Sequence, residues 1–197
     1  EPAADESAND DSYASLIYEP TDETVNDAQP ASIIEEGIKD LSPREARSIT
    51  EFARLAKEIR ERGIDNKVET CATHIKQLLK EGYNPIIWCR YIATSDYVAD
   101  ELTKRLGKSY QDIYITSITG AMPEEERREK VEEIGMHSRR VLVATDCLSE
   151  GVNLQESFDA VVHYDLPWNP NRLEQREGRV DRFGQQKTLV KAVLLYG

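Results

Sequence analysis

Short apolar runs alternate with helical patterns through most of this sequence, and the alternation constrains its fold more than any other feature. The apolar, β-rich runs lie at 85–89, 112–119, 140–145, 160–164 and 188–196. Helical patterns run from Thr94 to about Leu106, from Pro123 onwards, and from a start that Asn169 or Asn171 could cap. Strands that alternate with helices favour a parallel sheet whose two faces the helices cover. The sequence therefore predicts an α/β fold.

Two more helices are expected ahead of the first strand. Ser42 can cap the first of them, Pro43 suits its first turn, and apolar residues recur at helical spacing up to Gly63. The second helix covers roughly 66–81. We expect residues 41–64 to form a helical lead-in or brace that precedes the sheet.

The acidic side chains are concentrated at the start of the chain. The 197 residues carry a formal net charge of −12, with 37 acidic and 25 basic side chains. Residues 1–40 hold 12 of the acidic side chains and one basic one, Lys39, which leaves 25 acidic and 24 basic side chains in 41–197. Residues 1–30 also have few large apolar side chains, a composition typical of disordered linkers. We therefore expect an acidic, largely disordered linker at 1–40, and the overall acidity says little about what the near-neutral remainder binds.

Cysteine usage and hydropathy limit the cellular compartment. Cys71, Cys89 and Cys147 are odd in number, far apart and include no CxxC pair. This pattern argues against a metal-ligand cluster and against a disulfide framework. No apolar run approaches the roughly 20 residues that cross a bilayer, and residues 1–30 lack the basic start and apolar stretch of a secretory signal. We expect a cytoplasmic protein that does not bind membranes.

Residues 174–185 read EQREGRVDRFGQ and are the segment most informative about chemistry. Arg179 and Arg182 are three positions apart, a spacing that on a helix places two guanidiniums one turn from each other. Two fixed guanidiniums beside Gly178, where backbone can come close, suit the recognition of a polyphosphate. The alternative is a solvated helix face whose arginines make incidental ion pairs with neighbouring acidic residues.

Further candidate residues follow the ends of the expected strands. Ligands of parallel α/β sheets bind beyond the carboxyl ends of the strands, where this sequence has Arg90–Tyr91, Thr119–Gly120, Thr145–Asp146 and 165–167. The segment TDCLSEGVNLQ (145–155) could present the Thr145 hydroxyl and backbone N–H groups to a phosphate. An ordinary strand–turn–helix connection explains the same segment equally well.

Other conspicuous residues favour structural roles. Trp88 lies inside an apolar run and is expected in the core. Trp168, in DLPWNP (165–170), is expected to pack on that turn, with a partner lobe as the alternative, and a structural role is favoured for Arg127. The three histidines share no metal-ligand spacing, so none of them is expected to be catalytic.

These segments resemble the motifs of a known superfamily. EQREGRVDRFGQ resembles motif VI of superfamily-two helicases and translocases, TDCLSEGVNLQ resembles motif V, and PIIWCRYIAT (85–94) is similar to motif IV. The strings DRFGQ, DLPWNP and GVNLQ look most like the bacterial Swi/Snf-type branch, since DEAD-box helicases usually carry Asp in place of Asn153. The resemblance implies a RecA-like parallel sheet with helices on both faces, and it identifies 65–197 as the second RecA-like lobe of a two-lobed motor.

The resemblance also implies roles for individual residues. Arginine fingers that stabilise charge on the γ-phosphate are worth ~10³–10⁵ in rate. By resemblance, catalysis is assigned to Arg179 and Arg182, nucleotide binding to Gly151, Asn153, Gln175 and Gly178, and nucleic-acid binding to Arg90, Thr119, Gly120 and Thr145.

Two motifs of the first lobe are missing from these 197 residues: the phosphate loop GxxxxGK[ST] and the acidic DExx box. We therefore expect ATP and Mg²⁺ to be held mainly by the first RecA-like lobe of the same full-length protein, and this chain alone to be inactive as an ATPase. Gln175 and Asp181 replace the His and Gly that DEAD-box proteins usually carry, which favours a translocase on double-stranded DNA.

Two alternatives stay open at this point. One is a non-catalytic regulatory or scaffolding module built on a helicase-like lobe, although the intact arginine pair speaks against degeneracy. The other is a self-contained phosphate-binding α/β enzyme such as a phosphoesterase. The second alternative requires a catalytic nucleophile or a metal cluster that the sequence does not reveal.

Overall fold

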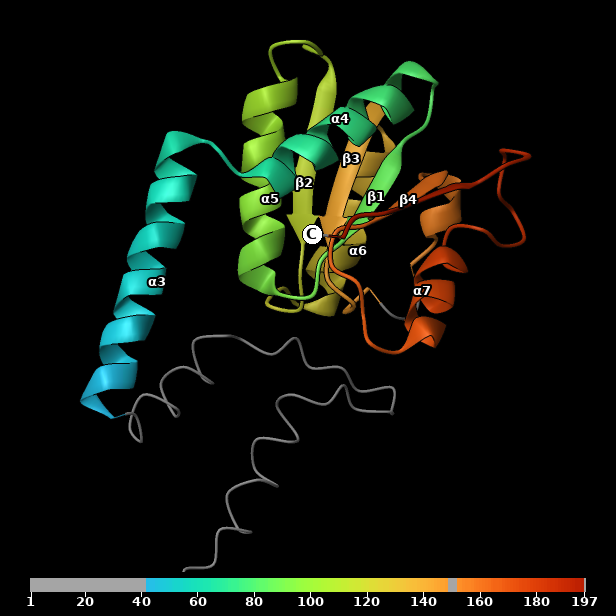
Figure 1. The fold of residues 1–197 in the computed structure, drawn as a ribbon. Helices are drawn as coiled ribbons and strands as arrows, with labels where there is room; N and C mark the ends of the chain where they lie inside the picture. Colours follow the sequence, from blue (N-terminus) through green and yellow to red (C-terminus); the bar gives the residue numbers. More distant parts are fainter. Residues whose placement is uncertain (1–41, 149–151, 197) are drawn as a thin grey trace, which may run out of the picture.

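A five-stranded parallel sheet forms the body of the molecule, and helices cover both of its faces (Figure 1). The computed structural model describes residues 42–148 and 152–196. In chain order its elements are α3 (Pro43–Arg62), α4 (Asn66–Lys80), β1 (Pro85–Trp88), α5 (Ile92–Leu106), β2 (Ile113–Ile118), α6 (Glu124–Gly135), β3 (Arg139–Ala144), the 3₁₀ helix η2 (Leu154–Glu156), β4 (Ala160–His163), α7 (Pro170–Glu177) and β5 (Lys191–Leu194). The predicted α/β fold is confirmed, while the predicted linker at 1–40 lies outside the described residues. Within the described ranges, no helix is both long enough and apolar enough to cross a membrane.

The order of the strands across the sheet is β2-β3-β1-β4-β5, which puts β1 in the centre. Ile87 of β1 pairs with Val143 of β3 on one side and with Val162 of β4 on the other. All four residues of β1 are buried, as expected for a parallel strand that is covered on both faces. Because the strands are parallel, the chain leaves β3, β1 and β4 at neighbouring points along one edge of the sheet, here called the carboxyl edge.

Successive side chains of β1 enter two separate apolar cores. Ile87 packs with buried residues of α4 and α5 on one face, whereas Ile86 and Trp88 pack with buried residues of α6 and η2 on the other. This alternation follows from the two-residue period of a strand. Trp88 is fully buried, which confirms its expected place in the core. Burial of each such side chain contributes about 1.5–3 kcal/mol, so the two cores fix the strands whose ends form the carboxyl edge.

The lead-in helix α3 stands apart from the sheet (Figure 1). It begins with a capping box in which the Ser42 N–H donates to the Glu45 carboxylate at 2.9 Å and the Ser42 hydroxyl accepts from the Glu45 N–H. It ends at Gly63, whose φ of 64° lies in the left-handed region that glycine adopts without strain. None of its residues is buried, and Phe52 in its apolar stripe is 68 % exposed. The predicted helix is therefore present, and its role as a brace stays a prediction, as does the boundary proposed at residue 65.

Candidate functional site

Helix α7 lies next to the carboxyl edge, and strong local signals in the sequence determine where it begins. The Asn169 side chain accepts a hydrogen bond from the Asn171 N–H at 3.0 Å, which caps the helix, and Pro170 occupies its first turn. Both features favour a helix start at this position. The helix ends at Glu177, so it spans only eight residues.

The turn after α7 corrects the expectation that Arg179 and Arg182 lie one turn apart on a single helix. Residues 178–180 form a turn, and neither arginine is helical. Gly178 is about 1 kcal/mol less favourable than Ala in a helix interior. Val180 is fully buried in the core behind β1, so the chain turns inward there instead of extending α7.

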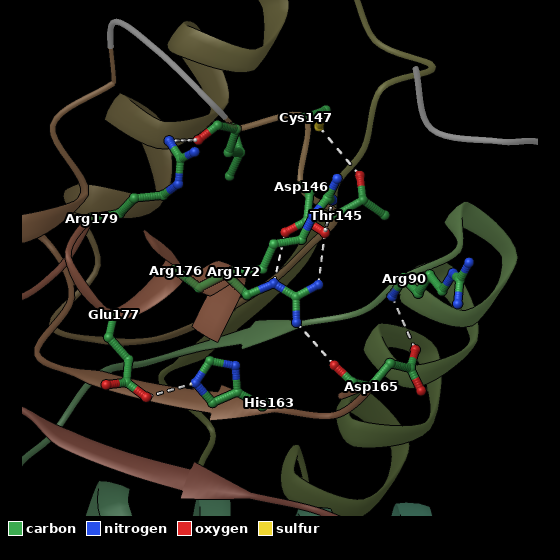
Figure 2. Close-up of polar contacts among 11 residues, drawn as sticks. Arg90, Thr145, Asp146, Cys147, His163, Asp165, Arg172, Arg176, Glu177 and Arg179 are labelled. Atoms are coloured by element: carbon green, nitrogen blue, oxygen red, sulfur yellow. Dashed lines mark hydrogen bonds and ion pairs between the residues drawn. The ribbon is translucent and has the colours of Figure 1, made fainter. Parts of the chain in front are cut away.

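Arg176 is the most deeply placed cation of this region, with only 2 % of its surface exposed. Its Nε and Nη2 atoms donate to the two carboxylate oxygens of Asp146, each at 2.7 Å, and its Nη1 donates to the Asp165 carbonyl at 2.9 Å (Figure 2). The guanidinium also lies 5.8 Å from the centre of the Trp88 ring. Such a bidentate pair between a guanidinium and a carboxylate is both strong and geometrically specific.

The loop after β3 is held by arginines from several elements. Arg127 of α6 donates to the Cys147 carbonyl at 3.0 Å, and Arg179 donates to the Leu148 carbonyl at 2.7 Å. Arg172 of α7 adds an ion pair with Asp146 at 3.6 Å. Together with Arg176, these contacts fix three consecutive residues of the loop. The contact of Arg127 supports the structural role that the sequence favoured for it.

A second carboxylate, Asp165, connects the ends of β4 and β1. One of its oxygens accepts from the Arg90 N–H at 3.0 Å, and the other accepts from the Lys67 ammonium at 3.1 Å. That ammonium lies 4.4 Å from the centre of the Tyr164 ring. The sequence placed Asp146 and Asp165 along this edge but predicted no partner for either, and it assigned Arg176 no role of its own. The signal for these contacts was a pair of acidic residues just after β3 and β4, the strands on either side of β1, with an arginine on the next helix.

The residues predicted to contact nucleic acid all lie at the carboxyl edge but differ in exposure. The Thr145 N–H donates to the Ile118 carbonyl at 3.3 Å, which brings the ends of β3 and β2 together. Thr119 and Thr145 are buried, and the Thr145 hydroxyl contacts the Cys147 sulfur at 3.3 Å. Gly120 is exposed. The structure thus brings these residues to one edge, and their contact with phosphate stays a prediction.

Arg90, from the same predicted set, follows β1 and is half-buried. Its backbone N–H is occupied by Asp165, whereas its guanidinium lies 5.3 Å from the centre of the Tyr91 ring. Figure 2 shows the side chain pointing away from the cluster around Asp146. A role in binding a phosphate backbone is therefore compatible with its position and stays a prediction.

The residues predicted to contact nucleotide are mostly accessible. Gln175, Gly178 and Asn153 are exposed, and Gly151 lies outside the described residues. Arg182 is exposed, and within 42–148 and 152–196 no hydrogen bond or ion pair of its guanidinium is present. Arg179 is half-buried through its contact with the loop after β3. The two predicted arginine fingers therefore differ, one being anchored and the other directed to solvent.

A buried histidine supports the end of α7. His163 is fully buried at the end of β4, and its Nε2 lies 3.0 Å from the Glu177 carboxylate. Burial lowers the pKa of His163, and this effect outweighs the raising effect of the Glu177 hydrogen bond. The neutral imidazole therefore predominates, and its second nitrogen finds no partner among the described residues.

Trp168 corrects another expectation, because it does not pack on the turn that carries it. Its side chain is 89 % exposed. The preceding Tyr164 is the last buried residue of this connection, and the chain from there to the cap at Asn169 runs along the surface. No described segment covers the indole, which leaves Trp168 available to a neighbouring molecule or domain.

Metal chemistry finds no support in the described part of the chain. Within residues 42–148 and 152–196, no cluster of three or more His, Cys, Asp or Glu side chains could hold a metal ion. Cys71 and Cys89 are buried free thiols.

The known proteins that this chain resembles are helicases. The family model described as the helicase conserved C-terminal domain matches residues 66–184. "ATP-dependent RNA helicase DBP8" of Kluyveromyces lactis is 38 % identical over 88 residues, which are 45 % of this chain and 20 % of that protein. "Uncharacterized ATP-dependent helicase YqhH" of Bacillus subtilis is 54 % identical over 48 residues, 24 % of this chain and 8 % of that protein. The chain thus spans about a fifth or less of the length of these relatives.

A solved structure shares the fold. "Mss116p DEAD-box helicase domain 2 bound to an RNA duplex" superposes with a TM-score of 0.55 at 21 % identity, covering 66 % of this chain and 50 % of that one. At this identity the likeness concerns the fold, and it confirms the RecA-like arrangement that the motifs implied. Since the family model spans α4 to the turn after α7, the chain belongs to the helicase conserved C-terminal domain family, the C-terminal lobe of superfamily-two helicases.

Proposed function

We propose that this chain is the second motor lobe of an ATP-dependent nucleic-acid translocase, and that Arg179 and Arg182 are its arginine fingers. The observation that carries the proposal is the solvent-exposed Arg182 beside Arg179, on a turn next to the carboxyl edge of a helicase-family lobe. Guanidiniums in this position suit phosphoryl transfer, in which negative charge spreads over the oxygens of the γ-phosphate.

The nucleotide would lie between this lobe and a first lobe. Exposed Gln175, Gly178 and Asn153 would contact it from this side, and the absence of a side chain at Gly178 allows backbone to come close. The first lobe would hold ATP and Mg²⁺ for the most part, because this chain contains neither the phosphate loop nor the acidic box. The bound cation supplies charge neutralisation at the phosphates. The part of this lobe is to bring Arg182 and Arg179 to the γ-phosphate from outside the first lobe's site.

The nucleic-acid track would run along the strand ends that carry Arg90, Thr119, Gly120 and Thr145. Contacts to a phosphate backbone carry no sequence information, so binding is expected to tolerate any sequence and to weaken with salt. The bacterial Swi/Snf-like features around Gln175 and Asp181 favour double-stranded DNA as the track. The named RNA helicase among the relatives favours RNA instead, so the stimulating polymer has to be measured.

The first prediction concerns Arg182 in the whole protein that carries this lobe. Arg182→Ala should lower nucleic-acid-stimulated ATP hydrolysis at least 10³-fold, since an arginine finger is worth ~10³–10⁵ in rate. Phosphate release should be followed with double-stranded DNA and with single-stranded RNA as separate stimulators. Arg139→Ala is the matched control, because that arginine pairs with exposed Asp112 at the opposite edge of the sheet. An Arg182→Ala protein that kept most of its stimulated activity would refute the assignment.

One observation favours the alternative of a non-catalytic regulatory module. Arg179 donates to the Leu148 carbonyl, so it is engaged within the lobe in this conformation. A regulatory lobe would leave that contact in place permanently. In that case the wild-type whole protein would bind its partners without any ATP hydrolysis that nucleic acid stimulates.

The cytoplasm is the location that we propose. The cysteines described in the structure are free thiols, and two of them, Cys71 and Cys89, are buried. Burial raises the pKa of Cys71 to about 12, and it also raises that of Cys89. Protonated, buried thiols of this kind are inert, which fits a reducing compartment.

A further inference from the structure

Among the described residues, two side-chain contacts, here called rungs, connect the loop after β3 to the end of α7 and the turn that follows. The first is the bidentate pair between Asp146 and Arg176, and the second is the hydrogen bond from Arg179 to the Leu148 carbonyl. The rungs join the same two segments and lie two residues apart on the loop and three on the other side. The Arg176 rung is buried, whereas Arg179 is half-buried.

We propose that Asp146 and Arg176 form a positioning couple that keeps the turn carrying Arg179 and Arg182 in register with the loop after β3. This inference rests on the proposed function. Arg176 is too deeply buried to reach a nucleotide itself, and each of its three guanidinium nitrogens already donates to the Asp146 carboxylate or to the Asp165 carbonyl. Its effect on hydrolysis is therefore transmitted through the arginines that follow it.

Backbone hydrogen bonds fix the local shape of the turn, among them those from the Val180 and Asp181 N–H groups to the Glu177 carbonyl at 2.9 and 2.8 Å. These bonds stay within the turn, so its link to the loop after β3 depends on the side chains of Arg176 and Arg179. When Arg179 leaves the Leu148 carbonyl to contact a phosphate, the second rung is lost. The Asp146–Arg176 pair then remains, together with the buried Val180, to hold the turn in place.

A purely structural role is the competing explanation. Buried ion pairs are weak evidence for stability, although removal of one partner is costly because the other charge stays buried. Arg176→Lys keeps the charge but loses the planar fork, so it cannot satisfy both Asp146 oxygens and the Asp165 carbonyl together. Asp146→Glu keeps the charge as well and displaces the carboxylate by one methylene. These two conservative variants separate positioning from simple charge burial.

The test compares Arg176→Lys, Asp146→Glu, Asp146→Asn and the double variant Arg176→Lys/Asp146→Asn in the whole protein. Melting temperature and the folded fraction are measured first, then kcat and the KM for ATP with saturating nucleic acid. Misplacement of reacting groups by about 1 Å can cost on the order of 100-fold in rate, so each single variant should lower kcat per folded molecule about 10- to 100-fold. The KM for ATP should change less than about threefold, because ground-state contacts are kept. The double variant should be no worse than the poorer single variant, as expected for residues that act together.

The matched control is Arg105→Lys on α5. Arg105 also bridges two carboxylates, those of Glu69 and Glu101, at 3.0 and 3.1 Å. Arg105 lies in the last turn of α5 and contacts none of the residues named at the carboxyl edge. The same chemical change should therefore leave kcat within about twofold, as is usual for substitutions away from a site.

Three results would overturn the inference. They are an unchanged kcat in folded Arg176→Lys, a rise in KM at constant kcat, and unfolding of both conservative variants. The last result would make the pair structural. Failure of the proposed function would be recognised in other proteins. The wild type would then lack ATP hydrolysis that nucleic acid stimulates, or Arg182→Ala would keep it, whatever the Arg176 variants do.

Discussion

Burial distinguishes the three arginines of residues 176–182. Arg176 donates to two oxygens of one carboxylate and to one carbonyl inside the lobe, so its position is determined by the fold. Arg182 is exposed and free to follow a ligand at the cost of side-chain entropy. Arg179 lies between these extremes. A motif that looks uniform in the sequence therefore contains one anchor, one intermediate and one accessible cation.

A prediction about a single residue concerns His163 and the pH dependence of stability. Burial is the largest effect on its pKa and lowers it, while Glu177 raises it, Arg176 lowers it and Asp146 raises it. A histidine whose pKa in the folded state lies below the unfolded value of about 6.5 binds protons more readily when unfolded. Stability should therefore be complete above about pH 6.5 and should fall as the pH decreases below that value.

The measurement compares the melting temperature of the wild-type chain with that of His163→Gln between pH 7.5 and pH 5.5. Because Gln does not titrate, the variant should lose less stability over this window than the wild type. Asp159, whose pKa is raised mainly by burial, gives the opposite sign of pH dependence and partly offsets the effect within each protein, but it is present in both and therefore drops out of the comparison. Parallel curves for the two proteins would show that His163 does not titrate as its burial indicates.

At the scale of elements, local signals predicted most of the fold. The strand runs correspond to β1 through β5, and the caps at Ser42 and Asn169 start α3 and α7. The end of α7 was not predicted, because it depends on the burial of Val180 against residues distant in sequence. The Asp146–Arg176 pair was missed for the same reason, since its members lie 30 positions apart and meet only when the strands are ordered. Exposure of Trp168 likewise depends on what the fold leaves uncovered.

The element-scale prediction concerns α3. None of its residues is buried, and its described contact with the body is that of Arg60, 5.4 Å from the centre of the Tyr97 ring. An exposed cation–π contact is worth about 0.5–1 kcal/mol. A chain that begins at Ile64 should therefore melt within about 4 °C of one that begins at Ser42, since 1 kcal/mol shifts the melting temperature of a 150–250-residue domain by about 2–4 °C.

Thermal unfolding followed by circular dichroism compares the two chains, and the helical signal per molecule should fall with the loss of α3. Phe52→Ser in the longer chain provides the control, because that side chain is already exposed and should be nearly neutral. A much larger loss of stability on truncation would mean that α3 packs against the body of the lobe in solution.

At the scale of the whole molecule, the lobe offers cations but no complete phosphate site. The carboxyl edge carries exposed Gly120, and the chain after α7 carries exposed Arg182, whereas residues 41–197 together are close to neutral. The sequence contains no phosphate loop to bind the triphosphate through backbone N–H groups. Affinity for ATP is therefore expected to come mostly from a partner lobe, with this lobe contributing at the γ-phosphate.

The last prediction follows for the isolated 197-residue chain. It should hydrolyse ATP no faster than a buffer control, with or without nucleic acid, and should bind a non-hydrolysable ATP analogue at best with millimolar affinity, about −4 kcal/mol. Phosphate release and calorimetric titration measure the two quantities, and the whole protein serves as the positive control for hydrolysis. Addition of the separately produced first lobe should restore some stimulated hydrolysis, and Arg182→Ala in this chain should abolish that restoration. Robust turnover by the isolated chain would instead mean that these 197 residues hold a complete site of their own.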